Sequence, residues 1–190
     1  MRAHTLFIAG ALLMPLSYTY ADPNSPSADD SNRLTMKEHV AKWMLSDEKF
    51  VEKAALSNMA EVELSKVALE KAQSPQVRDF AKQMIKDHTA ASTELKSIAQ
   101  SKNLAVPADL DREHQEKLTD LRGLSGADFD AKYLGTMEKD HEKAVTLFTA
   151  AAADQKLDKQ LQQFAAKTLP ILRGHSDHVQ ALDSKGVSAR

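Results

Sequence analysis

The sequence predicts an all-α fold in which four long helices pack as a bundle. From residue 47 onward the chain is rich in Ala, Lys, Glu, Gln and Leu, which favour helix. Apolar side chains in this region recur at alternating four- and three-residue steps, the spacing of helices that pack side by side. Together the composition and the period indicate a helical domain over residues 46–184.

Helix start signals divide this region. Ser46 before Asp47 opens the first helix, Ser74 before Pro75 supplies an N-cap and a proline at the first helical position, and Asp158 opens the last helix. We also expect a kink in the last helix, which contains a proline. The predicted helices span 47–73, 75–102, a short segment at 108–122, 127–154 and 158–184.

The middle connection determines the predicted topology. About 24 residues separate the second and third long helices, and the short helix within them covers about 22 Å at 1.5 Å per residue. That length carries the chain back along the bundle, whereas an up-and-down bundle needs only a short loop. The fold class is therefore a ferritin-like four-helix bundle with a short crossover helix.

The N-terminal region predicts export. Arg2 precedes an apolar run of about a dozen residues, shorter than the roughly 20 needed to span a bilayer, and small residues up to Ala21 follow. We interpret residues 1–21 as a signal peptide, 22–45 as a flexible leader with a short helix around Trp43, and 185–190 as a tail. The leader helix either docks on the bundle or binds a partner. The mature protein is expected in the periplasm without a transmembrane span.

Composition excludes several functional classes. The 190 residues include 25 Lys and Arg against 27 Asp and Glu, a formal charge of -2, so no basic field favours nucleic acid as a partner. The chain has no Cys, which excludes disulfides, thiolate metal ligands and cysteine nucleophiles. No serine-hydrolase motif was found.

Three histidines occupy the apolar stripes of three different helices. His88, His141 and His175 each fall near the middle of a predicted helix, as does Glu61 in the first helix. A buried imidazole without a polar partner is costly, and in an antiparallel bundle the middles of helices meet. We expect these four side chains to converge, either as ligands of a metal ion or as a polar network.

An internal repeat surrounds two of the histidines. Residues 84–88 (MIKDH) and 137–141 (MEKDH) are identical at four of five positions. Asp87 and Asp140 lie beside the apolar stripe, where each either accepts a hydrogen bond from an imidazole of a neighbouring helix or faces solvent. Three further side chains lie near the predicted site: Met84, Met137 and Glu138.

These neighbours have competing interpretations. Met84 and Met137 are one helical turn before a histidine and are expected to fill the core, although thioethers beside imidazoles also suit copper. Glu138 and His141 form a Glu-x-x-His pair like those of di-iron bundles. His178 flanks the stripe and is a lesser candidate for a ligand.

Four segments resemble a known family, the ferritin-like domain-of-unknown-function family numbered 4142. They are FVEKAALSNMAEVELSKVAL at 50–69, VRDFAKQMIKDH at 77–88, FDAKYLGTMEKDH at 129–141 and FAAKTLPILRGH at 164–175. The resemblance implies the fold, and it implies an exported or outer-membrane bacterial protein. The family pattern falls on Glu61, Asp87, His88, Met137, Asp140, His141, Leu169, Pro170 and His175.

The chain differs from true ferritins at the carboxylate positions. Ile85 and Leu172 stand three residues before His88 and His175, where a di-iron site uses Glu. We therefore expect a single transition-metal ion, zinc, copper or iron, on Glu61 and two or three histidines.

The leading functional hypothesis is an exported periplasmic metal-binding bundle in metal handling or envelope stress. The alternative is a metal-free structural or interaction module of the cell envelope, whose core histidines bond to acidic side chains. A ferroxidase-like redox enzyme is the weakest hypothesis, because the bridging carboxylates of a di-iron site are missing. The sequence names neither a reaction nor a protein partner.

Overall fold

The computed structural model describes residues 45–184. The predicted signal peptide, the tail and all of the leader except Leu45 lie outside the described residues. No helix within residues 45–184 is long and apolar enough to cross a membrane. The described helices are α2 (Asp47–Lys71), α3 (Pro75–Ser101), α4 (Arg112–Arg122), α5 (Gly126–Ala153) and α6 (Lys159–Ser184).

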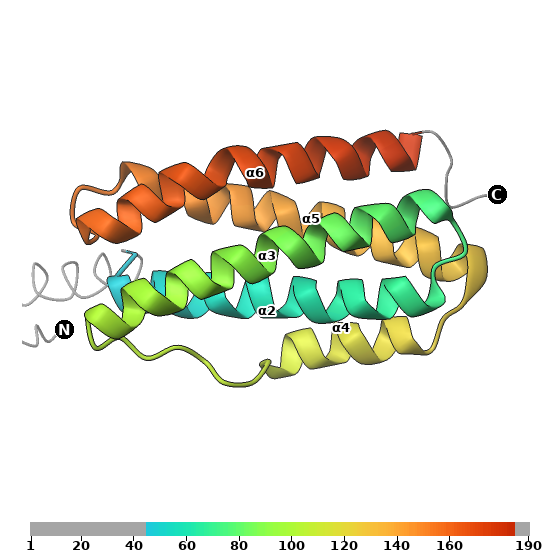
Figure 1. Ribbon diagram of the computed structural model, residues 1–190, viewed down its shortest axis with the longest axis horizontal. Helices are drawn as coiled ribbons and strands as arrows, with labels where there is room; N and C mark the ends of the chain where they lie inside the picture. Colours follow the sequence, from blue (N-terminus) through green and yellow to red (C-terminus); the bar gives the residue numbers. More distant parts are fainter. Residues whose placement is uncertain (1–44, 185–190) are drawn as a thin grey trace, which may run out of the picture. The chain divides into compact units, whose positions relative to one another are not determined.

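The four long helices form the predicted bundle (Figure 1). Helix α2 packs against α3 and α5, and α6 packs against the same two helices. The connection that contains α4 runs along the bundle from the end of α3 to the start of α5, so neighbouring long helices are antiparallel. The all-α fold and the crossover topology are therefore confirmed.

The start signals act largely as predicted. Ser46 accepts a hydrogen bond from the Lys49 amide, and Ser74 caps α3 ahead of Pro75. The short crossover helix begins at residue 112 rather than 108, because Asp111 is its N-cap. Helix α6 begins one residue after Asp158.

Helix α6 passes through its proline without ending. Pro170 and Gly174 both lie inside the single helix Lys159–Ser184. A proline at this position cannot donate the backbone hydrogen bond to the carbonyl of Ala166, four residues earlier. The helix is thus one continuous element. Apolar residues at its start belong to one core cluster and those at its end to the other.

Asp130 attaches the turn between α2 and α3 to helix α5. Its carboxylate, 1 % exposed, accepts backbone hydrogen bonds from Gln73 (3.1 Å) and Ser74 (2.8 Å). A buried carboxylate with two backbone donors is well compensated for its lost hydration. This contact fixes the start of α5 against the α2–α3 turn.

The apolar core consists of two clusters separated along the bundle. The first joins the end of α2, the start of α3, α4, the start of α5 and the end of α6, and it includes Met84, Tyr133 and Met137. The second joins the opposite ends of the four long helices and includes Phe50, Phe148 and Phe164. The residues at the middle of each long helix lie between the clusters.

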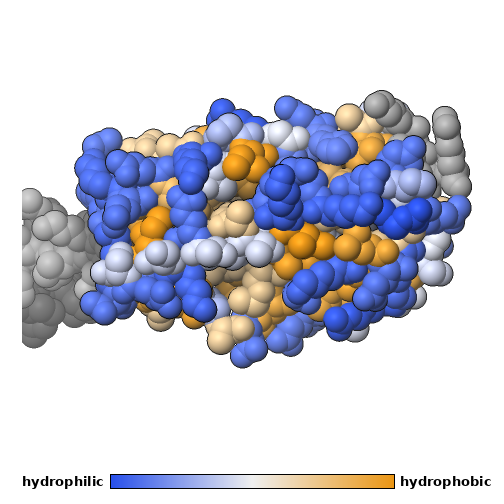
Figure 2. Space-filling view, viewed as in Figure 1, coloured by the Kyte–Doolittle hydropathy of each residue, from blue (hydrophilic) through white to orange (hydrophobic). Residues whose placement is uncertain are grey.

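Apolar side chains gather mainly in this interior. The face drawn in Figure 2 is largely hydrophilic, with smaller hydrophobic areas between the charged side chains. Such a distribution is ordinary for a globular domain. The unusual polar residues of this bundle are therefore the buried ones at mid-bundle.

Candidate metal centre

Four predicted side chains meet between the two apolar clusters. Glu61 comes from α2, His88 from α3, His141 from α5 and His175 from α6, and none is more than 5 % exposed. The imidazole centroids lie 5.3 to 5.7 Å apart. One nitrogen from each histidine lies within 4.8 Å of the other two. The structure thus brings together the whole predicted set.

Each imidazole is held from outside by one hydrogen-bond acceptor, and together these bonds set the tautomers. An amide oxygen, a carbonyl and a carboxylate can only accept, so the ring nitrogen facing each of them carries the proton. The three bonds join His88 Nδ1 to Asn58 Oδ1 (2.9 Å), His141 Nδ1 to the Met137 carbonyl (2.8 Å) and His175 Nε2 to Asp87 Oδ2 (2.9 Å).

The remaining ring nitrogens face one another with their lone pairs. His141 Nε2 lies 3.3 Å from His175 Nδ1, and in the neutral tautomers neither atom has a proton to share. His88 Nε2 lies 2.9 Å from the carboxylate oxygen Oε2 of Glu61, yet neither atom is in hydrogen-bond geometry. Such an arrangement of buried acceptors requires a positive charge among them, either a proton or a metal ion.

Glu61 supplies a buried carboxylate. Ser57 donates a 2.8 Å hydrogen bond to Oε1, which leaves Oε2 to face His88 and, at 3.5 Å, His141. Burial raises the pKa of Glu61, but the electrostatic attraction of the His88 and His141 imidazoles and the hydrogen bond from Ser57 outweigh it and lower that pKa to about 2. The side chain is therefore an anion at neutral pH.

His175 remains neutral at neutral pH. Burial lowers its pKa, the hydrogen bond to Asp87 raises it in part, and the neighbouring His88 and His141 lower it further. The net effect is a pKa below the usual 6.5. A neutral imidazole oriented by a carboxylate is the form that binds metal ions.

The inner donor atoms fit a single ion. Nitrogen and oxygen ligands at about 2.0–2.1 Å from zinc in tetrahedral geometry lie roughly 3.3–3.4 Å from one another. Three of the inner separations are 2.9, 3.3 and 3.5 Å, which bracket this value, and the histidine nitrogens all lie within 4.8 Å of one another. Three imidazole nitrogens and one carboxylate oxygen are a donor set for zinc, copper or iron. The site is thus compatible with one transition-metal ion.

Other predicted neighbours lie elsewhere. Asp140 was expected to accept a hydrogen bond from an imidazole or to face solvent; instead it is 8 % exposed and pairs with Lys117 of α4 at 2.7 Å. Glu138 is half-buried and, among the described residues, makes no hydrogen bond or ion pair with the four central side chains. His178 is exposed and packs edge-on against Phe80.

The two methionines of the repeat lie in the apolar core. Met84 and Met137 are fully buried and belong to the first apolar cluster, as expected of core fillers. Met137 contributes through its backbone carbonyl, which holds His141. Its side-chain sulfur therefore is not needed to explain the repeat.

Sequence reasoning missed two residues, Ser57 and Asn58. They lie four and three positions before Glu61, one helical turn away on α2. Asn58 is 2 % exposed, and polar residues one turn from a buried glutamate are the signal that would have identified them.

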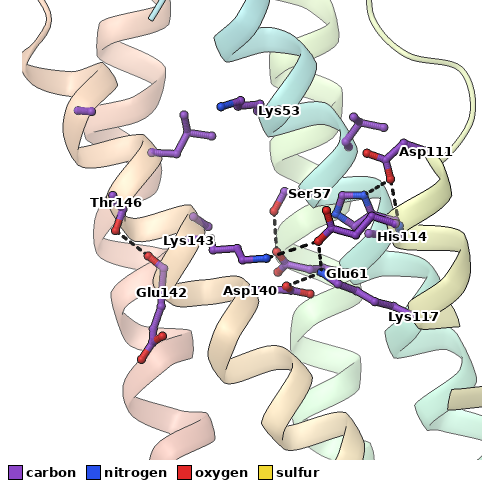
Figure 3. A pocket seen from close by; sticks show the side chains of 16 residues that line it. Lys53, Ser57, Glu61, Asp111, His114, Lys117, Asp140, Glu142, Lys143 and Thr146 are labelled. Atoms are coloured by element: carbon purple, nitrogen blue, oxygen red, sulfur yellow. Dashed lines mark hydrogen bonds and ion pairs between the residues drawn. The ribbon is translucent and has the colours of Figure 1, made fainter. Parts of the chain in front are cut away.

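A cavity of about 800 Å³ lies on the α2, α4 and α5 side of the site. Figure 3 shows Ser57 bonded to Glu61 at its wall, with Lys117 reaching Asp140 beside them. Of the four central side chains, only Glu61 lines this cavity.

Solved structures share this fold. A fragment of a DUF305 protein from Deinococcus radiodurans has a TM-score of 0.65 at 14 % identity, covering 73 % of this chain and 95 % of that one. A secreted DUF305 protein from Streptomyces coelicolor, described as putative, has a TM-score of 0.63 at 14 % identity (74 % and 93 % covered). CopM in the Cu(II)-bound form has a TM-score of 0.63 at 17 % identity (75 % and 98 % covered).

No curated protein matches the sequence. A family model does match, over residues 33–182, which include every residue of the candidate site. The chain belongs to the family described as Domain of unknown function (DUF4142).

Proposed function

We propose that this protein is an exported metal-binding bundle that handles transition metal in the periplasm. Glu61, His88, His141 and His175 bind one ion between the two apolar clusters. The observation that carries the proposal is the set of opposed lone pairs: three imidazoles held from outside direct their free nitrogens at one point beside a buried carboxylate.

Two other observations support it. The N-terminal segment has the features of a signal peptide, and one structural neighbour is described as secreted. Another neighbour was solved with Cu(II) bound, which makes copper the first metal to test. The donor set of nitrogen and oxygen suits Cu²⁺ or Zn²⁺ better than Cu⁺, which prefers sulfur.

The test is the metal content of the mature chain. Residues 22–190, purified without a chelator or a histidine tag, are incubated separately with Cu²⁺, Zn²⁺ and Fe²⁺, desalted and analysed by mass spectrometry for metal per chain. We expect one ion per chain for at least one metal. His88→Ala and His141→Ala each remove a ligand and should lose it.

His178→Ala is the matched control, because His178 is exposed and outside the site. This variant should retain the metal content of the parent. A parent chain that takes up no metal contradicts the proposal and favours the metal-free interaction module, in which a protonated imidazole pairs with Glu61.

A further inference from the structure

The candidate site is reached from a second direction, between α3 and α6. A small cavity of about 140 Å³ opens there, and its wall includes His88, His175 and Asp87. Two of the three central imidazoles therefore line this cavity. His88 Nε2 is buried without a hydrogen-bond partner, so one of the two imidazoles at this wall has a nitrogen left to bind an ion.

The opposite cavity offers less access to the ligands. Of the four proposed ligands, only Glu61 lines it, and Ser57 already donates a hydrogen bond to Oε1 of that carboxylate. Lys117 and Asp140 form an ion pair of 2.7 Å in the same wall. An ion on this side would have to displace these contacts before it reached an imidazole.

An ion pair joins the two helices beside the small cavity. Lys167 of α6 lies 2.8 and 3.1 Å from the two carboxylate oxygens of Glu94 of α3. Both residues line the cavity, and their side chains are 67 % and 38 % exposed. An exposed pair of this kind contributes little to stability and opens readily. Ala90 and Ala91 complete the α3 wall with small side chains.

We propose that the metal ion enters and leaves between α3 and α6, and that the Glu94–Lys167 pair controls this passage. The inference rests on the proposed metal site. When Lys167 swings away, Glu94 presents a carboxylate to the incoming ion, and Asp87, His88 and His175 lie further in along the same wall. When the pair is closed, the ammonium group of Lys167 repels a cation at the entrance.

Opposite charge changes at this pair should change uptake in opposite directions. Lys167→Ala leaves an unpaired carboxylate and should raise the rate of Cu²⁺ uptake about fivefold at low ionic strength. Glu94→Gln leaves an unpaired ammonium and should lower that rate by a similar factor, about fivefold. Added salt should reduce both effects, because it screens exposed charges.

The opposite cavity provides a matched control pair. Lys143 and Glu113 lie 3.5 Å apart with side chains 69 % and 63 % exposed, and both line that cavity. Lys143→Ala and Glu113→Gln make the same charge changes on the other side of the site. Under the proposal they leave the rates of Cu²⁺ uptake and release near those of the parent.

Ala90→Phe tests the passage by size rather than by charge. Ala90 is exposed at the cavity, so a larger side chain there should leave the fold intact. A narrower passage raises the barrier in both directions. We expect uptake and release of Cu²⁺ to slow by the same factor, with an unchanged dissociation constant.

The measurement is stopped-flow absorbance of Cu²⁺ uptake by the mature chain, with release followed by adding a chelator in excess. Equilibrium titration of each variant gives the dissociation constant separately. Bound Cu²⁺ with rates that respond at Glu94, Lys167 and Ala90 supports the passage. If the chain binds Cu²⁺ but the rates change only in the Lys143 and Glu113 variants, or in neither pair of variants, the proposed passage is wrong and the metal site is still supported. A parent chain that binds no Cu²⁺ overturns the passage for this ion and counts against the metal site.

Discussion

At the scale of single residues, the direction of each imidazole matters more than its presence. His88, His141 and His175 would be ordinary buried histidines if their inner nitrogens carried protons. Their outer acceptors instead hold the protons on the far side of each ring. The site's affinity for a cation should therefore depend on residues that do not touch the ion.

Asn58 gives the sharpest test of this dependence. Asn58→Leu removes the acceptor for His88 Nδ1, so the ring can place its proton on the inner nitrogen. Loss of such an orienting bond should weaken metal binding by about 10- to 100-fold. Asn58→Asp keeps an acceptor oxygen and should retain most of the affinity. Equal losses in both variants, measured by competition with a chelator, would indicate a packing effect instead.

The pH dependence of binding follows from the pKa of His175. Protons compete with the ion for each imidazole, and the pKa of His175 is lowered below 6.5 mainly by burial. This ring should therefore not cause affinity loss between pH 8 and 7. We expect affinity to fall only as the pH drops below the lowered pKa of His175, by up to about tenfold per pH unit through this ring.

The same shift affects the metal-free fold. The folded state has the lower pKa at His175, so the unfolded chain binds the proton more readily as pH falls through about 6.5. The free energy of unfolding should decrease on acidification.

The pH dependence of metal affinity is measured by competition with a chelator from pH 8 to 5. A loss of affinity through His175 already between pH 8 and 7 would be at odds with its lowered pKa.

At the scale of helices, contacts at the ends set the level at which mid-helix residues meet. Asp130 fixes the α2–α3 turn to α5, which helps to bring Glu61, His88 and His141 to similar depth in the bundle. The backbone amides of Gln73 and Ser74 compensate the burial of that carboxylate. The register of α5 against α2 and α3 depends on this attachment.

Asp130→Ala should therefore reduce stability. Two backbone N–H groups, the part-buried one of Gln73 and the buried one of Ser74, lose a charged acceptor, which costs about 2–4 kcal/mol of unfolding free energy. Asp128→Ala is the control, since Asp128 lies exposed in the same first turn of α5 and should cost only a few tenths of a kcal/mol. Urea denaturation of both variants measures the difference; equal midpoints would show that the attachment contributes nothing.

At the scale of the whole molecule, local patterns identified most of the fold. The spacing of apolar residues located the helices, and Ser46, Ser74 and Asp158 located three of their starts. The start of α4 was misplaced because Asp111, not the residues before it, caps that helix. The topology followed from the length of one connection, because chain reach is a simple function of residue number.

Sequence patterns predicted only part of the candidate site. Periodicity placed His88 and His141 on buried faces, and equal depth in antiparallel helices placed Glu61 with them. It could not show that Asp140 would bind Lys117 rather than an imidazole, because that choice depends on where α4 crosses α2 and α5. The role of Asn58 likewise depends on the rotation of α2 against α3, which no one-dimensional pattern records.

The central claim, that one ion is held by three imidazoles and one carboxylate, is tested most directly by X-ray absorption on the Cu²⁺- or Zn²⁺-loaded chain. We predict a single shell of nitrogen and oxygen ligands at about 2.0–2.1 Å, accompanied by the outer-shell scattering of imidazole rings. A sulfur shell near 2.3 Å, or a metal shell without imidazole scattering, would contradict the account.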